Sequence, residues 1–218
     1  MVENFTQVNY LKEKVWEVIK INIINMIIKA NNTRYIFIHI PKTAGTSILK
    51  YFKNTEKGQK HEKISHSSYT QSVGKLKSFA MVRNPYDRLL SIFLHWRDNL
   101  KRIKETSEFE EFVLNLDKPN LWCKPNFIRR WQNRYIDPQV TWISNRKNVP
   151  IVDYIIKFEN INEDFNNFLV SEKFEDIKEL PHTNKTKHTD YKDYYNDDMI
   201  KVVEDKYKKD LEYFNYSF

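Results

Sequence analysis

Residues 35–47 read YIFIHIPKTAGTS, and this stretch decides the fold. Six mostly apolar, β-prone residues run directly into a short loop that holds one lysine and one of the chain's three glycines. A Thr-Ser pair then opens a segment with apolar residues at helical spacing. The stretch therefore predicts a strand, a tight loop and the start of a helix, an arrangement that surrounds an anion such as phosphate or sulfate with backbone N–H groups.

The loop differs from a Walker A loop in the position of its lysine. A Walker A loop places the lysine directly after its last glycine and before Ser or Thr. Here Lys42 comes before Gly45 in the chain. This order keeps the prediction of an anion-binding loop and argues against an ATPase.

A second stretch, residues 79–96, reads FAMVRNPYDRLLSIFLHW and repeats the pattern. Its apolar start predicts a strand that ends at Arg83, and Pro85 suits the first turn of a helix because its missing N–H costs nothing there. Ser91 lies about two turns into that helix. An arginine can bind phosphate oxygens through two parallel hydrogen bonds, and a serine hydroxyl can add another. The stretch therefore predicts a second contact to an anion.

Together the two stretches resemble the carbohydrate-type sulfotransferases, which include the heparan sulfate 2-O- and the chondroitin and dermatan sulfotransferases and small bacterial relatives. IIKFENINEDF at 155–165 and LPHTNKT at 180–186, with the C-terminal segment that follows, extend the resemblance over roughly residues 34–218. The resemblance implies a three-layer, P-loop-like α/β fold with a mainly parallel central sheet flanked by helices. The alternation of predicted strands and helices indicates the same class.

The resemblance also implies the donor, 3′-phosphoadenosine 5′-phosphosulfate (PAPS), used without a metal. In this family the loop that matches residues 41–47 binds the 5′-phosphosulfate, Arg83 and Ser91 match residues that bind the 3′-phosphate, and the segment 184–186 lies near the nucleotide. Thr46 and Ser47 also fit helix capping. The candidate donor-binding residues are Pro41, Lys42, Thr43, Ala44, Gly45, Thr46, Ser47, Arg83, Ser91, Asn184, Lys185 and Thr186.

Sulfuryl transfer needs an aligned donor, a stabilised leaving phosphate and a base for the acceptor hydroxyl. Lys42 is the natural group to contact the bridging oxygen or the sulfuryl oxygens. Among the six histidines we choose His66 as the base, because relatives carry their base between the two donor motifs. His61 and Glu62 are the alternatives.

The other histidines fit structural roles better than catalytic or metal-binding ones. His39 lies inside the first strand, and His95 lies on the helix after Ser91, where it can simply pack. His61 and His66 are five residues apart and His182 and His188 six apart, so neither pair shares one helical face, and no cysteine pair is present. We therefore expect no metal site.

Length and composition predict one folded domain, and the extent of the resemblance places it at residues 34–218, after an N-terminal helical extension at residues 1–33. Hydrophobic residues make up 40% of the 218-residue chain, enough for a substantial core. Apolar residues four apart within 10–30 predict the helix of the extension, which is expected to pack on the domain or on a partner. The segment 15–28 is too short and too polar to span a bilayer, and no signal peptide is visible.

The net charge of +7 suits a polyanionic donor and an acidic carbohydrate or glycoconjugate acceptor, although a solvated Lys-rich surface explains much of the excess. No zinc-ligand pattern or RNP-type motif supports nucleic acid binding. The single Cys123 fits a reducing compartment. These features predict a cytoplasmic protein, and the frequent Asn, Ile and Lys, typical of AT-rich genomes, predict a bacterial or viral origin.

Several local patterns predict helix ends, a strand and an ion pair. Ser107 and Glu110 form a capping-box signature, Asn196 can cap the last helix, and Ile151 to Phe158 predicts a further buried strand whose following Glu159 orders the turn. Asp87 and Arg88 fit a structural pair at a helix start. Aromatic residues and arginines in 117–138 suit either stacking on sugars or ordinary packing.

Three function classes follow from these observations. The first is a PAPS-dependent carbohydrate sulfotransferase that works by in-line displacement with a general base. The second is a P-loop nucleotide kinase or NTPase, which would need an acidic Mg²⁺ ligand where the second strand instead ends in Arg83. The third is a non-catalytic anion- or glycan-binding module on the same fold. Loops 54–77 and 117–138 are expected to set the acceptor, which the sequence does not identify.

Overall fold

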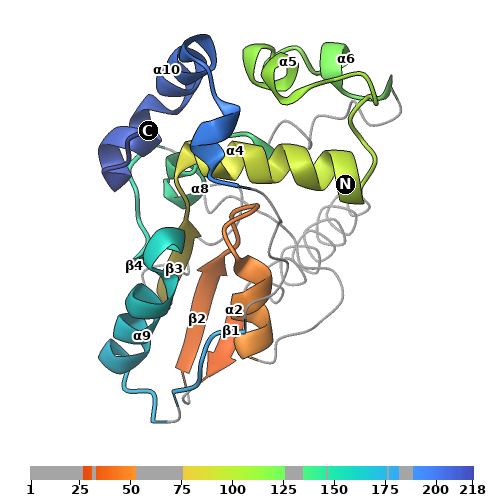
Figure 1. Cartoon of the computed structure of the whole chain (residues 1–218). Helices are drawn as coiled ribbons and strands as arrows, with labels where there is room; N and C mark the ends of the chain where they lie inside the picture. Colours follow the sequence, from red (N-terminus) through yellow and green to blue (C-terminus); the bar gives the residue numbers. More distant parts are fainter. Residues whose placement is uncertain are drawn as a thin grey trace, which may run out of the picture.

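A computed structural model describes residues 27–30, 33–52, 76–125, 135–145, 147–175, 177–181 and 189–218. These residues form an α/β structure around a four-stranded sheet with the strand order β1-β2-β3-β4 (Figure 1). The strands are β1 (Ile27–Ala30), β2 (Thr33–Ile38), β3 (Lys77–Val82) and β4 (Tyr154–Lys157). β1 is antiparallel to β2, whereas β2, β3 and β4 are parallel, so the prediction of a mainly parallel sheet is confirmed.

The prediction of helix for the end of the N-terminal segment is wrong at residues 27–30. These residues form β1, which pairs in register with β2 from Ile27 opposite Ile36 to Ala30 opposite Thr33. Ile28 is buried against the same sheet face as Tyr35, which explains why sheet pairing overrides the helical spacing of the isoleucines. The rest of the predicted helix lies outside the described residues, and the domain boundary at residue 33 stays a prediction.

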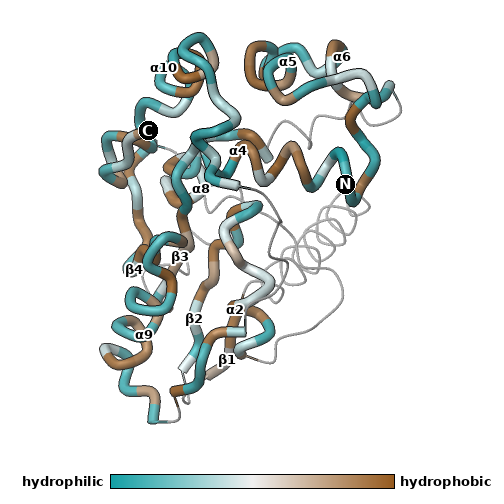
Figure 2. The backbone as a smooth tube through the Cα atoms, in the orientation of Figure 1, coloured by the Kyte–Doolittle hydropathy of each residue, from teal (hydrophilic) through white to brown (hydrophobic). Residues whose placement is uncertain are grey.

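Strand residues alternate between two hydrophobic layers, as the pleat requires. On one face, Tyr35, Phe37, Phe79 and Met81 pack against α2 (Gly45–Tyr51) and α9 (Ile161–Ser171). On the other face, Ile36, Ile38, Ala80 and Val82 pack against α8 (Val140–Ile143) and Phe214 of α10 (Asp197–Phe214). The sheet is therefore covered by helices on both sides, in three layers, and Figure 2 shows hydrophobic residues along β3.

A third hydrophobic cluster lies beyond the carboxyl ends of the parallel strands. In Figure 1 the arrowheads of β2 and β3 point toward α4 (Pro85–Leu94). α4 continues into a π-helical turn, η2 (His95–Asn99), and packs with α5 (Phe109–Leu114), α6 (Pro119–Trp122), η5 (Tyr191–Tyr194) and the first half of α10. Loops at the carboxyl end of a parallel sheet are the usual place for a ligand site, and both predicted donor motifs lie there.

Two of the local capping predictions have different outcomes. Asn196 caps α10 as predicted, because its side-chain oxygen accepts a hydrogen bond from the backbone N–H of Met199 at 3.0 Å. The Ser107–Glu110 capping box is wrong, because α5 begins after Glu108 and has no side-chain cap. The backbone N–H of Ser107 instead closes a turn on the carbonyl of Lys104. The Glu110 carboxylate accepts a hydrogen bond from the Asn196 side-chain amide at 2.7 Å.

Candidate functional site

The loop after β2 holds two non-glycine residues in the left-handed region. Lys42 has φ 66° and Ala44, the residue before α2, has φ 64°. Such conformations cost roughly 1–3 kcal/mol each and collect at binding sites. The fully buried Thr43 between them donates its hydroxyl to the carbonyl of Ile40 at 3.0 Å, which holds the loop in this shape. Ala44, not Thr46 or Ser47, occupies the capping position.

Gly45 is required by the close approach of His39. A Cβ atom at position 45 would lie 2.1 Å from Cδ2 and Nε2 of the His39 imidazole. The imidazole is buried and stacks on Phe37, with ring centroids 5.4 Å apart and an interplanar angle of 21°. His39 therefore has the structural role that the sequence predicts. Its ring packs against the first turn of α2.

Lys42 carries a desolvated ammonium group. Burial, and then the neighbouring charge of Arg83, lower the pKa of Lys42 to about 8. Within the described residues no carboxylate pairs with this lysine. Although Arg83 pairs with Asp87, the Lys42 ammonium beside it has no carboxylate partner among the described residues, and such a cation favours the binding of an anion.

Arg83 joins the two donor motifs. It is 7% exposed, its Nε donates to Asp87 at 2.7 Å and its Nη1 donates to the carbonyl of Lys42 at 3.3 Å. The guanidinium carbon also lies 4.2 Å from the ring centroid of Phe158, the residue directly after β4. The guanidinium is thus oriented from three sides before any ligand arrives, which favours tight binding.

Ser91, like Trp96 and Ser107, carries a buried polar atom that has no hydrogen-bond partner among the described residues. It is 1% exposed, and its Oγ has no hydrogen-bond partner there. Buried hydroxyls without partners are uncommon and call for an explanation. A ligand oxygen, as the resemblance implies for this residue, would satisfy it.

His95 lies one helical turn after Ser91, where α4 widens into η2. π-helical turns of this kind are frequent at functional sites. Burial and then the charge of Lys42 lower the pKa of His95, while a hydrogen bond to Asn99 opposes this shift. The imidazole of His95 therefore interacts electrostatically with Lys42. This places His95 near the predicted reaction site, whereas the sequence predicts only a packing role for it.

Arg88 has a role that differs from the predicted pair with Asp87. Asp87 pairs with Arg83, and the fully buried guanidinium of Arg88 donates to three backbone carbonyls, those of Pro41, Tyr135 and Asp137, at 3.1, 2.6 and 3.1 Å. These bonds tie the loop after β2 to residues 135–137. The sequence offers no signal for this, because the partners are main-chain atoms 47 to 49 residues away.

Glu159 holds the start of α4 and the C-terminal segment through its two carboxylate oxygens. Its Oε1 accepts a hydrogen bond from the N–H of Asn84 at 2.6 Å, and its Oε2 accepts one from the hydroxyl of Tyr216 at 2.8 Å. Asn84 in turn caps α4 through Tyr86 N and donates to the carbonyl of Ser217. The sequence predicts that Glu159 orders the turn after its own strand, whereas these two bonds join it to the start of α4 and to the C-terminal segment.

The structure brings together Lys42, Arg83 and the Pro41–Ser47 loop, with Ser91 following on α4. The other predicted site residues lie outside the described part of the chain: the candidate bases His61, Glu62 and His66, and the nucleotide contacts Asn184, Lys185 and Thr186. Trp122 of the 117–138 segment is a core residue, 1% exposed, whose indole N–H donates to the carbonyl of Asn115 at 2.8 Å. Ordinary packing is therefore its role.

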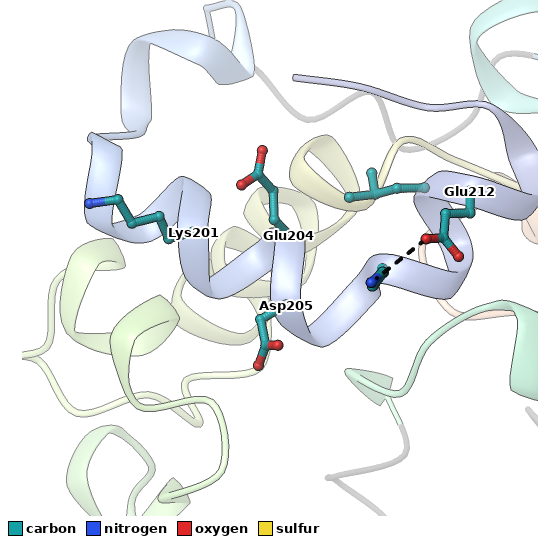
Figure 3. Close-up of a pocket in the computed structure, with 6 residues that line it drawn as sticks. Lys201, Glu204, Asp205 and Glu212 are labelled. Carbon is teal, nitrogen blue, oxygen red and sulfur yellow. Dashed lines mark ion pairs between the residues drawn. The ribbon is translucent and has the colours of Figure 1, made fainter.

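A hollow on the surface of α10 lies away from these groups. It is lined by Lys201, Glu204, Asp205, Lys208, Leu211 and Glu212, all from one helix that bends at Tyr207 (Figure 3). In Figure 3 the Lys201, Glu204 and Asp205 side chains point in different directions, and charges of both signs are mixed. This hollow has the character of a solvated helix face.

Comparison with protein families agrees with the geometry. A family model described as the sulfotransferase family matches residues 25–217, which include β1 and both donor motifs. The chain belongs to the sulfotransferase family. No curated protein and no solved structure matches it significantly. Membership implies that the protein is a transferase of sulfuryl groups.

Two features are absent from the residues of this sulfotransferase that the structure describes. No helix among them is long and apolar enough to cross a membrane. No group of three or more His, Cys, Asp or Glu side chains among them is arranged to hold a metal ion.

Proposed function

We propose that this sulfotransferase transfers a sulfuryl group from PAPS to a hydroxyl of a carbohydrate acceptor. The observation that supports the donor most directly is the arrangement of Lys42 and Arg83, two neighbouring cations at the carboxyl end of the sheet. The buried Ser91 hydroxyl, whose partner is missing among the described residues, fits a phosphate oxygen of the same donor. A carbohydrate acceptor and a cytoplasmic location remain predictions from the sequence.

The donor groups are assigned from the family resemblance and fit the chemistry of the residues present. Backbone and hydroxyl groups of Pro41–Ser47 would hold the 5′-phosphosulfate, and Arg83 with Ser91 would hold the 3′-phosphate. Asn184, Lys185 and Thr186 would contact the 3′-phosphate or the adenine. When bound, the donor supplies an activated sulfuryl group whose bond to the phosphate oxygen breaks as the bond to the acceptor oxygen forms.

Each residue of the site then has a distinct task. Lys42 offsets the negative charge that grows on the leaving phosphate, an interaction that strengthens only as the transfer proceeds. Arg83 binds a phosphate that carries the same charge before and during the reaction, so it contributes mainly to donor binding. His66, with His61 and Glu62 as alternatives, accepts the proton of the acceptor hydroxyl.

The choice of nucleotide tests the proposal. We expect adenosine 3′,5′-bisphosphate, the desulfated donor product, to bind without Mg²⁺ and much more tightly than ATP, because Arg83 and Ser91 fit a 3′-phosphate and the loop at residues 41–47 lacks the Walker A order of glycine, lysine and Ser or Thr. Isothermal titration calorimetry with both nucleotides, with and without Mg²⁺, measures this. Equal affinity for ATP, or a strict need for Mg²⁺, would contradict the proposal and favour a kinase or NTPase.

The lowered pKa of Lys42 predicts proton uptake on donor binding. In the free protein a pKa of about 8 leaves roughly half of Lys42 neutral at pH 8. A bound anion favours the ammonium form, so binding of adenosine 3′,5′-bisphosphate at pH 8 should take up protons, and affinity should fall as pH rises from 7 to 9. His95, whose pKa is lowered, stays neutral in this range.

Calorimetry at pH 8 in two buffers with different ionisation enthalpies measures this uptake. The control is Lys42→Arg. A guanidinium is already charged at this pH, so this variant should lose the part of the buffer dependence that protonation of Lys42 causes. An identical binding enthalpy in both buffers for the unmodified protein would show that Lys42 does not change protonation.

A further inference from the structure

The side chain of Gln139 is hydrogen-bonded to the backbone of Arg83 at both ends of its amide. The N–H of Arg83 donates to Gln139 Oε1 at 2.9 Å, and Gln139 Nε2 donates to the carbonyl of Arg83 at 2.7 Å. A hydrogen-bonded residue pair in an antiparallel sheet exchanges two bonds in this way. Through these two bonds the Gln139 side chain continues the pairing of β3 for one residue beyond the end of the strand. Gln139 is fully buried.

Gln139 is itself fixed by the last helix. Asp210 of α10 accepts hydrogen bonds from the backbone N–H groups of Gln139 and Val140, at 2.7 and 2.8 Å. Asp210 is also fully buried, and on the same helix Tyr207 donates its hydroxyl to the carbonyl of Ile136 at 2.6 Å. Residues 136–140 are thus held against the end of β3 by two groups of α10 that lie 70 and 71 residues away in the sequence.

These bonds decide where the Arg83 side chain starts. The guanidinium is oriented by Asp87, by the carbonyl of Lys42 and by the Phe158 ring. Those contacts act on the tip, whereas Gln139 holds the Cα from which the side chain extends. Loss of the amide would leave a buried N–H and a buried carbonyl unsatisfied, and the backbone would have to move to find new partners.

We propose that Gln139, held by Asp210, is a positioning residue that aims Arg83 at the 3′-phosphate of the donor. The inference rests on the proposed function, since it takes the 3′-phosphate as the ligand of Arg83. Its consequence is that the discrimination between nucleotides with and without a 3′-phosphate depends on a residue that does not touch either nucleotide.

The discrimination ratio tests this inference. The ratio is the dissociation constant of adenosine 5′-phosphate divided by that of adenosine 3′,5′-bisphosphate, and calorimetry measures both. Gln139→Met, which keeps the length of the side chain and removes both hydrogen bonds, should lower the ratio about tenfold or more, because a charge-assisted bond to phosphate is lost or misaligned. Arg83→Ala sets the lower limit of the ratio.

Glu172→Gln is the matched control. Glu172 is also buried, and it accepts hydrogen bonds from Tyr35, Lys77 and Tyr154 at the opposite end of the strands. This variant should lower the melting temperature without changing the ratio, which separates lost stability from lost positioning. If Gln139→Met does not fold, Asp210→Asn, which keeps the shape of its side chain, is measured in the same way, with a smaller decrease expected.

The outcomes distinguish the two levels of the proposal. An unmodified protein that binds adenosine 3′,5′-bisphosphate with a high ratio, together with a Gln139→Met ratio close to that of Arg83→Ala, supports the inference. A high ratio that persists in folded Gln139→Met or Asp210→Asn overturns the inference and leaves the proposed function standing. An unmodified protein that does not discriminate overturns both.

Discussion

Replacing Lys42 by alanine is expected to slow single-turnover sulfuryl transfer by about 10²–10³-fold, the usual cost of removing one group that stabilises transition-state charge. The affinity for intact PAPS should change much less. The physical reason is that the charge on the leaving phosphate grows only during transfer, so the ammonium contributes more to the transition state than to the bound donor. The measurement is the rate constant at saturating PAPS, with donor affinity determined in parallel.

Lys42→Ala should also leave the melting temperature unchanged or higher. Burial disfavours the charged ammonium, which the lowered pKa of Lys42 reflects, so its removal ends a cost of folding. The matched control is Lys50→Ala, since Lys50 is an exposed lysine in the last turn of α2, the helix that follows the Lys42 loop. A Lys42→Ala protein that keeps its rate constant at saturating donor would show that Lys42 does not act on the leaving group.

Replacing His66 by alanine is expected to reduce sulfuryl transfer on the order of 10²–10⁴-fold while donor affinity stays nearly constant. This is the usual effect of losing a general base. The assignment rests on sequence alone, because His66 lies between the two donor motifs and an imidazole titrates near neutral pH. Single-turnover transfer of labelled sulfate to an oligosaccharide acceptor measures the rate, and calorimetry measures the donor affinity.

His61→Ala and Glu62→Ala are the controls for this assignment and should have much smaller effects. His95→Ala belongs in the same series, because the structure places its imidazole within reach of the Lys42 charge. An active His66→Ala protein would move the base to whichever of these variants is inactive. Loss of donor binding in His66→Ala would instead make His66 a nucleotide ligand.

The parts of the fold that could be predicted from the sequence are those encoded locally. The strand–loop–helix order around residues 35–47 and 79–96 follows from apolar runs, Pro85 and helical spacing, and the structure has β2 with α2 and β3 with α4 at these places. The meeting of Lys42 and Arg83 also follows, because parallel neighbouring strands end at the same edge of a sheet. Local pattern and topology point to the same site.

The parts that could not be predicted depend on contacts between distant main-chain atoms. Arg88, Gln139 and Asp210 have ordinary sequence surroundings, and their importance comes from backbone partners 47 to 71 residues away. The capping box predicted at Ser107 failed for a different reason. The sequence pattern is present, but the N–H of Ser107 bonds to the carbonyl of Lys104 in a turn, and the helix begins only after Glu108. A pattern of residue types carries no information on which of two local bonding schemes the surrounding fold selects.

The contact between His39 and Gly45 imposes an order on the changes that this chain can accept in evolution. A methyl group at position 45 would overlap the imidazole at 2.1 Å, so alanine can enter there only after a smaller side chain has replaced His39. The reverse order passes through a protein whose donor loop is pushed out of shape. Replacement of His39 alone leaves a space beside Phe37 and is the tolerable first step. Homologues with a side chain at the position of Gly45 should therefore lack the imidazole.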